Sequence, residues 1–224
     1  MIFLLIETSS QVCSIAIANE NKIIKISEEN TGLKHAALAP KFAKDILENY
    51  KPDAVVLSAG PGSYTGLRIG TSLAKGICYG LDIPLIGVST LLAMTNGLQG
   101  KQTFPSDSLF VPMLDARRME VYTAVYDNKD NEILPVQPMI LNEESFQVFS
   151  EKRLIMFGSG SDKAKTLFTK NQHIHFVDNF SLSAQYLLHQ AIRKYKQNKF
   201  EDISYFEPLY LKAFHITTSK KKLF

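Results

Sequence analysis

The chain has 224 residues, of which 45% are hydrophobic and 21% are charged, and its 25 basic and 22 acidic side chains give a net charge of +3. This ordinary globular composition excludes a disordered, collagen-like or coiled-coil chain, and the charge is too small to indicate nucleic-acid binding by itself. No apolar run approaches the roughly 18–20 residues of a membrane span, and the start lacks the features of an export signal. We therefore expect a cytoplasmic protein without membrane contact, in which Cys13 and Cys78 are reduced.

The first hundred residues alternate between strand and helix patterns. Strands are predicted from short apolar or alternating runs over residues 2–8, 12–18, 23–26, 53–59 and 83–88. Short polar turns join the first three, as in an antiparallel meander. Helices are predicted between and after the later strands, giving the order βββαβαβα.

The helices of this first part have recognisable starts. Leu38, Phe42 and Ile46 recur every four residues, and this helix is expected to begin near Ala39, so that Pro40 lies in its first turn. The second helix follows a glycine-rich loop within residues 60–79. Ser89 is a predicted N-cap for a short third helix that runs through residue 94.

A segment rich in Gly, Pro and Ser, residues 97–108, predicts a lobe boundary. We expect an N-terminal, partner-binding lobe over residues 1–100 and a smaller, degenerate C-terminal lobe over 101–224. Within the second lobe, apolar runs predict strands over residues 109–114, 120–126 and 154–157. Amphipathic patterns predict helices over residues 162–168 and 181–196.

The sharpest local feature is the block GPGSYTGLRIG at residues 60–70. Although a loop that opens a helix can hold an anion, this one lacks the Lys-Ser or Lys-Thr pair of a P-loop and the glycine spacing of a dinucleotide fingerprint. The structural interpretation is stronger, because small residues recur every four positions at Gly62, Gly66, Gly70, Ala74 and Cys78. Such a stripe lets another helix approach closely, within the lobe or across an interface. That packing would offset the roughly 1 kcal/mol that each helical glycine costs relative to alanine.

The histidines and late basic residues carry weaker signals. His35 has no histidine partner four residues away, and the pair His173 and His175 has no third ligand nearby, so we expect no metal site and no cofactor. Basic residues gather late in the chain, at Arg193, Lys194, Lys196 and Lys199 and again at Lys220, Lys221 and Lys222. They are interpreted as a solvated helix face and a tail, with attraction of RNA within a larger assembly as the alternative.

Several motifs occur in the order seen in the TsaB (YeaZ) family, which the chain resembles over almost its whole length. The motifs are IETS at residues 6–9, His35 with Leu38 and Pro40, GPGSYTGLRIG at 60–70 with AKG at 74–76, Val88 with Ser89, DAR at 115–117, EVY at 120–122 and PLYL at 208–211. The glycine-rich block is the most specific of them. Arg118 and Met119, between DAR and EVY, are a modest departure from the family pattern.

The resemblance implies a two-lobed α/β fold of the actin/sugar-kinase type, with RNase-H-like lobes and mixed sheets flanked by helices. It also implies a part in making N6-threonylcarbamoyladenosine at tRNA position 37, as the non-catalytic partner of a paralogue, TsaD. That paralogue holds a metal with two histidines of its first-lobe helix, where this chain has only His35. A heterodimer with TsaD, a small ATPase (TsaE) that joins it, a homodimer when alone, and tRNA contact only through the complex are the implied associations.

Two sets of residues follow as candidate sites. A partner interface would combine Leu38 and Phe42, the small residues Gly66, Gly70 and Ala74, and a polar rim of Arg68, Thr71 and Lys75. A vestigial nucleotide site would combine Glu7, Thr8, Asp115, Gly158 and Gly160. No catalytic residue is expected. The main alternative is an active small-molecule kinase or ATPase that uses Glu7 and Asp115 for a metal–phosphate group; a peptidase is disfavoured by the missing ligand set.

Overall fold

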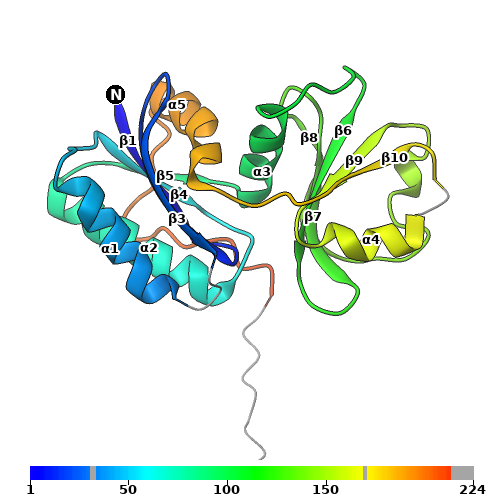
Figure 1. The fold of residues 1–224 in the computed structure, drawn as a ribbon, viewed down its shortest axis with the longest axis horizontal. Helices are drawn as coiled ribbons and strands as arrows, with labels where there is room; N and C mark the ends of the chain where they lie inside the picture. Colours follow the sequence, from blue (N-terminus) through cyan, green and yellow to red (C-terminus); the bar gives the residue numbers. More distant parts are fainter. Residues whose placement is uncertain (31–33, 169–170, 213–224) are drawn as a thin grey trace, which may run out of the picture.

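Two lobes lie side by side in the computed structural model, which describes residues 1–30, 34–168 and 171–212 (Figure 1). Each lobe is built on a five-stranded sheet, with strand orders β3-β2-β1-β4-β5 and β8-β7-β6-β9-β10. In each sheet three antiparallel strands come first, and two strands parallel to the first of them follow. The lobes therefore repeat one topology, and the expected class of two mixed sheets flanked by helices is confirmed.

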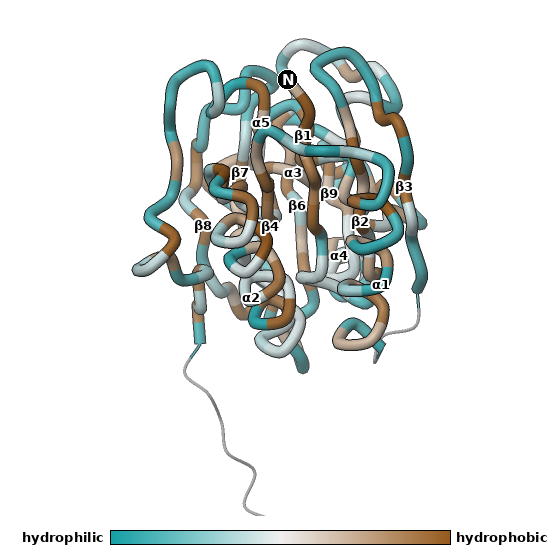
Figure 2. Tube along the Cα trace, turned by 90° about the vertical axis from the view of Figure 1, so that its left-hand side faces the viewer, coloured by the Kyte–Doolittle hydropathy of each residue, from teal (hydrophilic) through white to brown (hydrophobic). Residues whose placement is uncertain are grey.

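The first sheet is buried on both faces, except along its edge strand β3, which is partly exposed. Its strands are β1 (Ile2–Glu7), β2 (Val12–Asn19), β3 (Ile23–Asn30), β4 (Ala54–Ser58) and β5 (Leu85–Val88). Successive side chains of a strand point to opposite faces, so Phe3 and Leu5 enter one core and Leu4 and Ile6 enter the other. Burial on both faces explains why β1 and β4 are continuous apolar runs, which Figure 2 shows as brown segments in the interior.

Helices from distant parts of the sequence cover these two faces. One face carries α1 (His35–Leu47) and α2 (Tyr64–Leu81), and the other carries the short 3₁₀ helix η2 (Ala184–Leu187) and α5 (Leu188–Lys196). The predicted start of α1 near Ala39 is wrong, because the helix begins at His35 and holds Pro40 in its interior. Because proline has no N–H, the Ala36 carbonyl receives no helical hydrogen bond from residue 40. Pro40 and Ala36 are both exposed, so water can bond to this carbonyl instead.

The second lobe has one sheet and fewer helices. Its elements are β6 (Leu109–Asp115), β7 (Glu120–Tyr126), β8 (Glu132–Ile140), the 3₁₀ helix η1 (Gln147–Phe149), β9 (Leu154–Phe157), α4 (Ser161–Phe168) and β10 (Ile174–Val177). Strand β8 is absent from the sequence prediction. Pro135 and Pro138 interrupt its pattern, and two prolines in one strand are most easily accommodated at a sheet edge, which is where β8 lies.

The lobes are joined by α3 (Thr90–Gln99), which is longer than predicted. Its N-cap is Ser89, as expected, and the Ser89 Oγ accepts a hydrogen bond from Leu92 N at 3.4 Å. Leu91 and Met94 of this helix pack in the core of the second lobe, although they lie before residue 100. The chain also returns to the first lobe at η2 and α5. The division into residues 1–100 and 101–224 thus separates the two sheets, but not the helical layers that cover them. Within the described ranges, no helix is long and apolar enough to cross a membrane.

Candidate functional site

The stripe of small residues on α2 faces the interior of its own lobe. A Cβ added at Gly66 or Gly70 would run into the backbone oxygen or the hydroxyl of Thr8, and Ala74 is fully buried. The Thr8 hydroxyl also donates a 2.8 Å hydrogen bond to the Gly66 carbonyl. The prediction that Gly66, Gly70 and Ala74 point outward to a partner helix is therefore wrong. They are small because α2 lies directly against the turn that follows β1.

A second stripe of small residues on α2 does face outward. Ser72, Gly76 and Gly80 again recur every four residues, and all three are exposed. Among the described atoms, a Cβ added at Gly76 or Gly80 would meet nothing within 4 Å. The spacing alone indicates both stripes, and only the packing of α2 on the sheet distinguishes them. Sequence reasoning thus identified the kind of feature and chose the wrong face of the helix.

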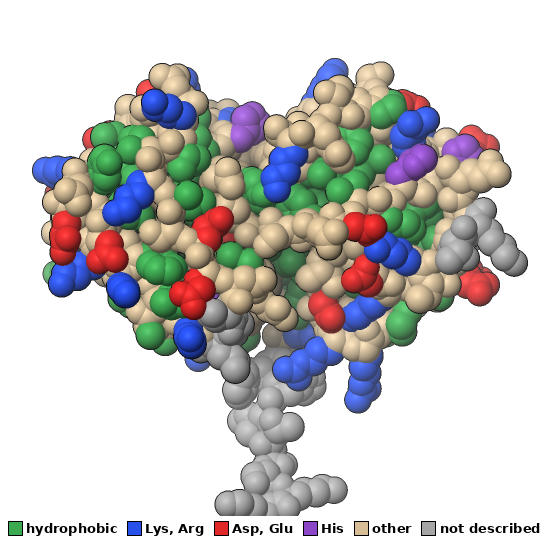
Figure 3. All heavy atoms as spheres, viewed as in Figure 1, with side chains coloured by type: hydrophobic (Ala, Val, Ile, Leu, Met, Phe, Trp, Pro, Cys, Tyr) green, Lys and Arg blue, Asp and Glu red, His purple; other side chains and the backbone are tan. Residues whose placement is uncertain are grey.

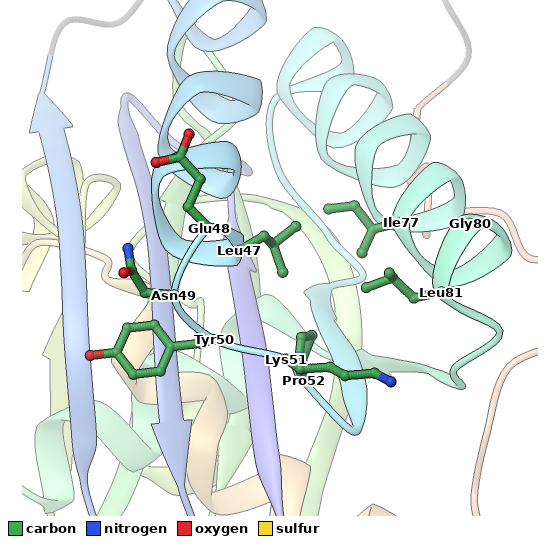
Figure 4. Close-up of a pocket in the computed structure, with 9 residues that line it drawn as sticks. All are labelled: Leu47, Glu48, Asn49, Tyr50, Lys51, Pro52, Ile77, Gly80 and Leu81. Carbon is green, nitrogen blue, oxygen red and sulfur yellow. The ribbon is translucent and has the colours of Figure 1, made fainter.

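An apolar groove runs beside this outward stripe, between α1 and α2. It has a volume of about 600 Å³, and Figure 4 shows Leu47 of α1 and Ile77 and Leu81 of α2 pointing into the gap between the helices. A second groove of about 420 Å³ shares Leu47 and Ile77 and extends toward Leu73. Leu38 and Phe42, both predicted interface residues, are half-buried on α1. We call the outward faces of α1 and α2, with these grooves, the α1/α2 face.

The three residues of the predicted polar rim, Arg68, Lys75 and Thr71, have different surroundings. The Arg68 guanidinium lies over the Tyr64 ring at 4.3 Å, and Tyr64 in turn contacts the Tyr210 ring at 4.8 Å. Lys75 donates a hydrogen bond of 3.4 Å to the carbonyl of Ser204. Thr71, in contrast, is buried, so its placement on an exposed rim is wrong.

The first half of the predicted nucleotide site is closed. Glu7 is fully buried at the end of β1, and its Oε1 accepts hydrogen bonds from Ser9 N at 2.6 Å and Ser9 Oγ at 2.5 Å. Its Oε2 has no hydrogen-bond partner among the described residues, although the nearby Ser58 hydroxyl favours the ionised form slightly. Burial outweighs these effects and raises the pKa of Glu7. A carboxyl held in this way is a structural group and is not offered to a metal–phosphate.

The second half lies in the other lobe and has its own structural role. Asp115 is partly exposed, and although partial burial raises its pKa, Lys163 at 2.7 Å and the Arg117 N–H hold that pKa below its usual value. A Cβ at Gly158 or Gly160 would collide with β6 or β7, so both glycines let the turn between β9 and α4 approach the sheet.

The two halves do not meet. In the described part of the chain, neither Glu7 nor Thr8 makes a hydrogen bond or ion pair with the second-lobe group. The carboxyl end of β4, where open α/β sheets bind ligands, is covered by the chain itself, because Leu209 N donates a 2.8 Å hydrogen bond to Ala59 O. The kinase alternative therefore loses its site.

The remaining candidate side chains, His35 and the two cysteines, are buried. The His35 ring is buried and lies 3.2 Å from the Val12 carbonyl oxygen, and no group of three or more His, Cys, Asp or Glu side chains among the described residues could hold a metal. Burial raises the pKa of Cys13 to about 11 and of Cys78 to about 12, so both thiols are unreactive at neutral pH.

Basic side chains of α5 also have partners within the protein. Lys196 pairs with Glu20 at 3.2 Å, Lys194 donates to the Gly87 carbonyl at 2.5 Å, and Arg193 lies 3.9 Å from Asp130. These contacts favour the interpretation of α5 as a packed helix with a solvated edge. Lys220, Lys221 and Lys222 lie outside the described residues.

Comparison with known proteins identifies the family. The family model described as "TsaD: tRNA N6-adenosine threonylcarbamoyltransferase" matches residues 29–215. The chain is 29% identical to the tRNA threonylcarbamoyladenosine biosynthesis protein TsaB of Escherichia coli over 95% of both chains, and 34% identical to that of Bacillus subtilis over 70% of both.

The fold agrees with this relationship. A Pseudomonas aeruginosa protein described as similar to the peptidase YeaZ superposes with a TM-score of 0.79 and 23% identity, over 94% of this chain and 99% of that one. YeaZ from the same organism superposes with a TM-score of 0.77 and 22% identity, over 94% and 100%. From the match to most of the chain and the close relatives in sequence, we conclude that the protein belongs to the TsaB family, within the group that the TsaD family model covers.

Proposed function

We propose that this protein acts in the N6-threonylcarbamoyladenosine modification of tRNA position 37, as the non-catalytic partner of a TsaD-type transferase. Family membership supports the pathway, since the relatives in Escherichia coli and Bacillus subtilis are named for the biosynthesis of this nucleoside. The observation that carries the role of partner is the α1/α2 face. This face combines the apolar grooves with an outward stripe of small residues. The predicted nucleotide-site residues, in contrast, make contacts within the protein.

The α1/α2 face has the properties of a helix-packing surface. Gly76 and Gly80 leave space above α2, so the backbone of a second helix can come close. Tyr79 is 86% exposed and Leu81 is 40% exposed, and both would leave water on association. A TsaD-type paralogue, which carries the equivalent pair of first-lobe helices, is the proposed occupant, and a second copy of this chain is the occupant when the paralogue is absent. In the cell we place this complex in the cytoplasm, with a TsaE-type ATPase and tRNA bound to it.

Replacement of Gly76 by leucine tests the proposal. The larger side chain fits the isolated lobe but fills the space that a partner helix needs, so Gly76→Leu should fold normally and lose co-purification with a TsaD-type protein. Thr166→Leu, which adds a leucine to an exposed position of α4, is the matched control and should co-purify like the wild type. Undiminished co-purification of a folded Gly76→Leu protein would show that the α1/α2 face is not the interface.

A further inference from the structure

The turn between β6 and β7 presents two arginines from an uncommon backbone. Arg117 has φ of 71° and Arg118 has φ of 48°, and both side chains are exposed. Glycine, asparagine and aspartate usually occupy such left-handed positions, because other side chains crowd the backbone there. Two consecutive arginines in this conformation place two guanidinium groups at the tip of one hairpin.

The backbone of this turn is held from both sides. Asp115 Oδ1 accepts hydrogen bonds from Arg117 N at 2.6 Å and from Lys163 Nζ at 2.7 Å. Lys212 Nζ donates to the Ala116 carbonyl at 3.1 Å and pairs with the Glu120 carboxylate. The two acidic residues of the hairpin are therefore neutralised by two lysines from other segments, and the hairpin tip is fixed before any partner arrives.

Among the residues that the structure describes, the two guanidinium groups have no direct partner, although the Arg117 charge helps to lower the pKa of Asp115. Over the described ranges, neither the Arg117 nor the Arg118 guanidinium makes a hydrogen bond or ion pair. The basic side chains of α5 differ, because Arg193, Lys194 and Lys196 each have a partner inside the molecule. Figure 3 shows basic side chains projecting from the lower end of the second lobe, where the β6–β7 turn lies. A guanidinium offers a planar fork of donors that matches phosphate oxygens.

We propose that Arg117 and Arg118 bind the phosphate backbone of the tRNA that the complex modifies, an inference that rests on the proposed function. An acidic protein is the less suitable partner, because protein interfaces centre on buried apolar anchors and the hairpin tip offers only Met119, which is 38% exposed.

The test uses the complex of the full chain with a TsaD-type protein and measures tRNA affinity at several salt concentrations. In the double variant R117N/R118N, asparagine tolerates the left-handed backbone and removes both charges. We expect affinity to fall about 10-fold, equally for tRNAs of different sequence, and the slope of log affinity against log salt to drop by about 1–2. K196A/K199A, at the end of α5 and three residues beyond it, removes the same charge and should change neither quantity.

The outcomes separate this inference from the one it rests on. If the wild-type chain does not associate with a TsaD-type protein, the proposed function fails. If the complex forms and R117N/R118N binds tRNA as tightly as the wild type, the arginines do not contact RNA. Loss of protein co-purification in R117N/R118N, with a normal thermal unfolding midpoint, would make the hairpin a protein contact and would also overturn the proposal.

Discussion

Glu7 shows how a residue with the chemistry of a catalytic group can serve only structure. Its carboxyl lies at the end of β1, out of reach of water, and both hydrogen bonds to its Oε1 come from Ser9, two residues away. Burial destabilises the ionised carboxylate, and this is the largest influence on the pKa of Glu7. The group that could have held a metal–phosphate instead closes the turn against which α2 packs.

This burial has a consequence for stability. The pKa of Glu7 in the folded protein is raised above its ordinary value of 4.5. The contribution of this group to the free energy of unfolding is therefore fully present below pH 4.5, and it is lost as the pH rises through the folded-state pKa. In Glu7→Gln the side chain cannot ionise, and the amide oxygen can still accept from Ser9. We therefore expect the free energy of unfolding of Glu7→Gln to lack this decline, which is limited to about 1.36 kcal/mol per pH unit for one proton. Urea unfolding of both proteins from pH 4 to pH 8 measures it, and parallel pH profiles would contradict the buried, protonatable state.

At the scale of the element, α2 has two faces that the sequence presents in the same way. Stripes of small residues with a four-residue period occur at Gly66, Gly70 and Ala74 and at Ser72, Gly76 and Gly80. Only the first is pressed against the sheet. Helix periodicity defines which residues share a face, but it does not say which face meets the protein's own core, because that depends on where the β1–β2 turn lies.

Alanine at two of these glycines should have opposite effects on stability. In Gly76→Ala the new methyl group meets open space, so the protein should gain about 0.5–1 kcal/mol from better helix propensity. In Gly70→Ala the methyl group collides with Thr8 and approaches Leu57 Cδ1 at 3.1 Å, so overpacking should outweigh that gain and cost about 1–3 kcal/mol. Urea midpoints of the two variants decide the matter. A stabilised Gly70→Ala would mean that α2 is not seated on β1 in the way described.

The same scale shows what could be predicted from the sequence. Strands with covered faces, such as β1 and β4, are strong apolar runs and were predicted almost to the residue. The edge strand β8 was missed because its two prolines are typical of loops, and Pro40 led to a late start for α1 because a proline inside a helix is rare. The proposed partner face lies on the pair of helices that the sequence predicted, but the small residues predicted for it face the lobe interior.

At the scale of the whole molecule, the repeated sheets are held together by more than the chain that links them. Asp130, at the turn between β7 and β8, accepts hydrogen bonds from Asn96 of α3 at 2.6 Å and from Gln190 of α5 at 2.8 Å, and only 6% of its side chain is exposed. Gly97 lets α3 approach the ring of Tyr186 in η2. These contacts tie the helices of the first lobe to the second sheet.

The proposed function requires that this chain contribute binding surfaces, and no reacting group, to tRNA modification. The most direct test is reconstituted N6-threonylcarbamoyladenosine formation by a TsaD-type protein, with wild-type chain, Glu7→Gln or Gly76→Leu added. We expect the wild type and Glu7→Gln to support the same rate, because Glu7 is only structural, and Gly76→Leu to support none, because the α1/α2 face is blocked. Loss of modification with a folded Glu7→Gln protein, together with full support by Gly76→Leu, would contradict the account.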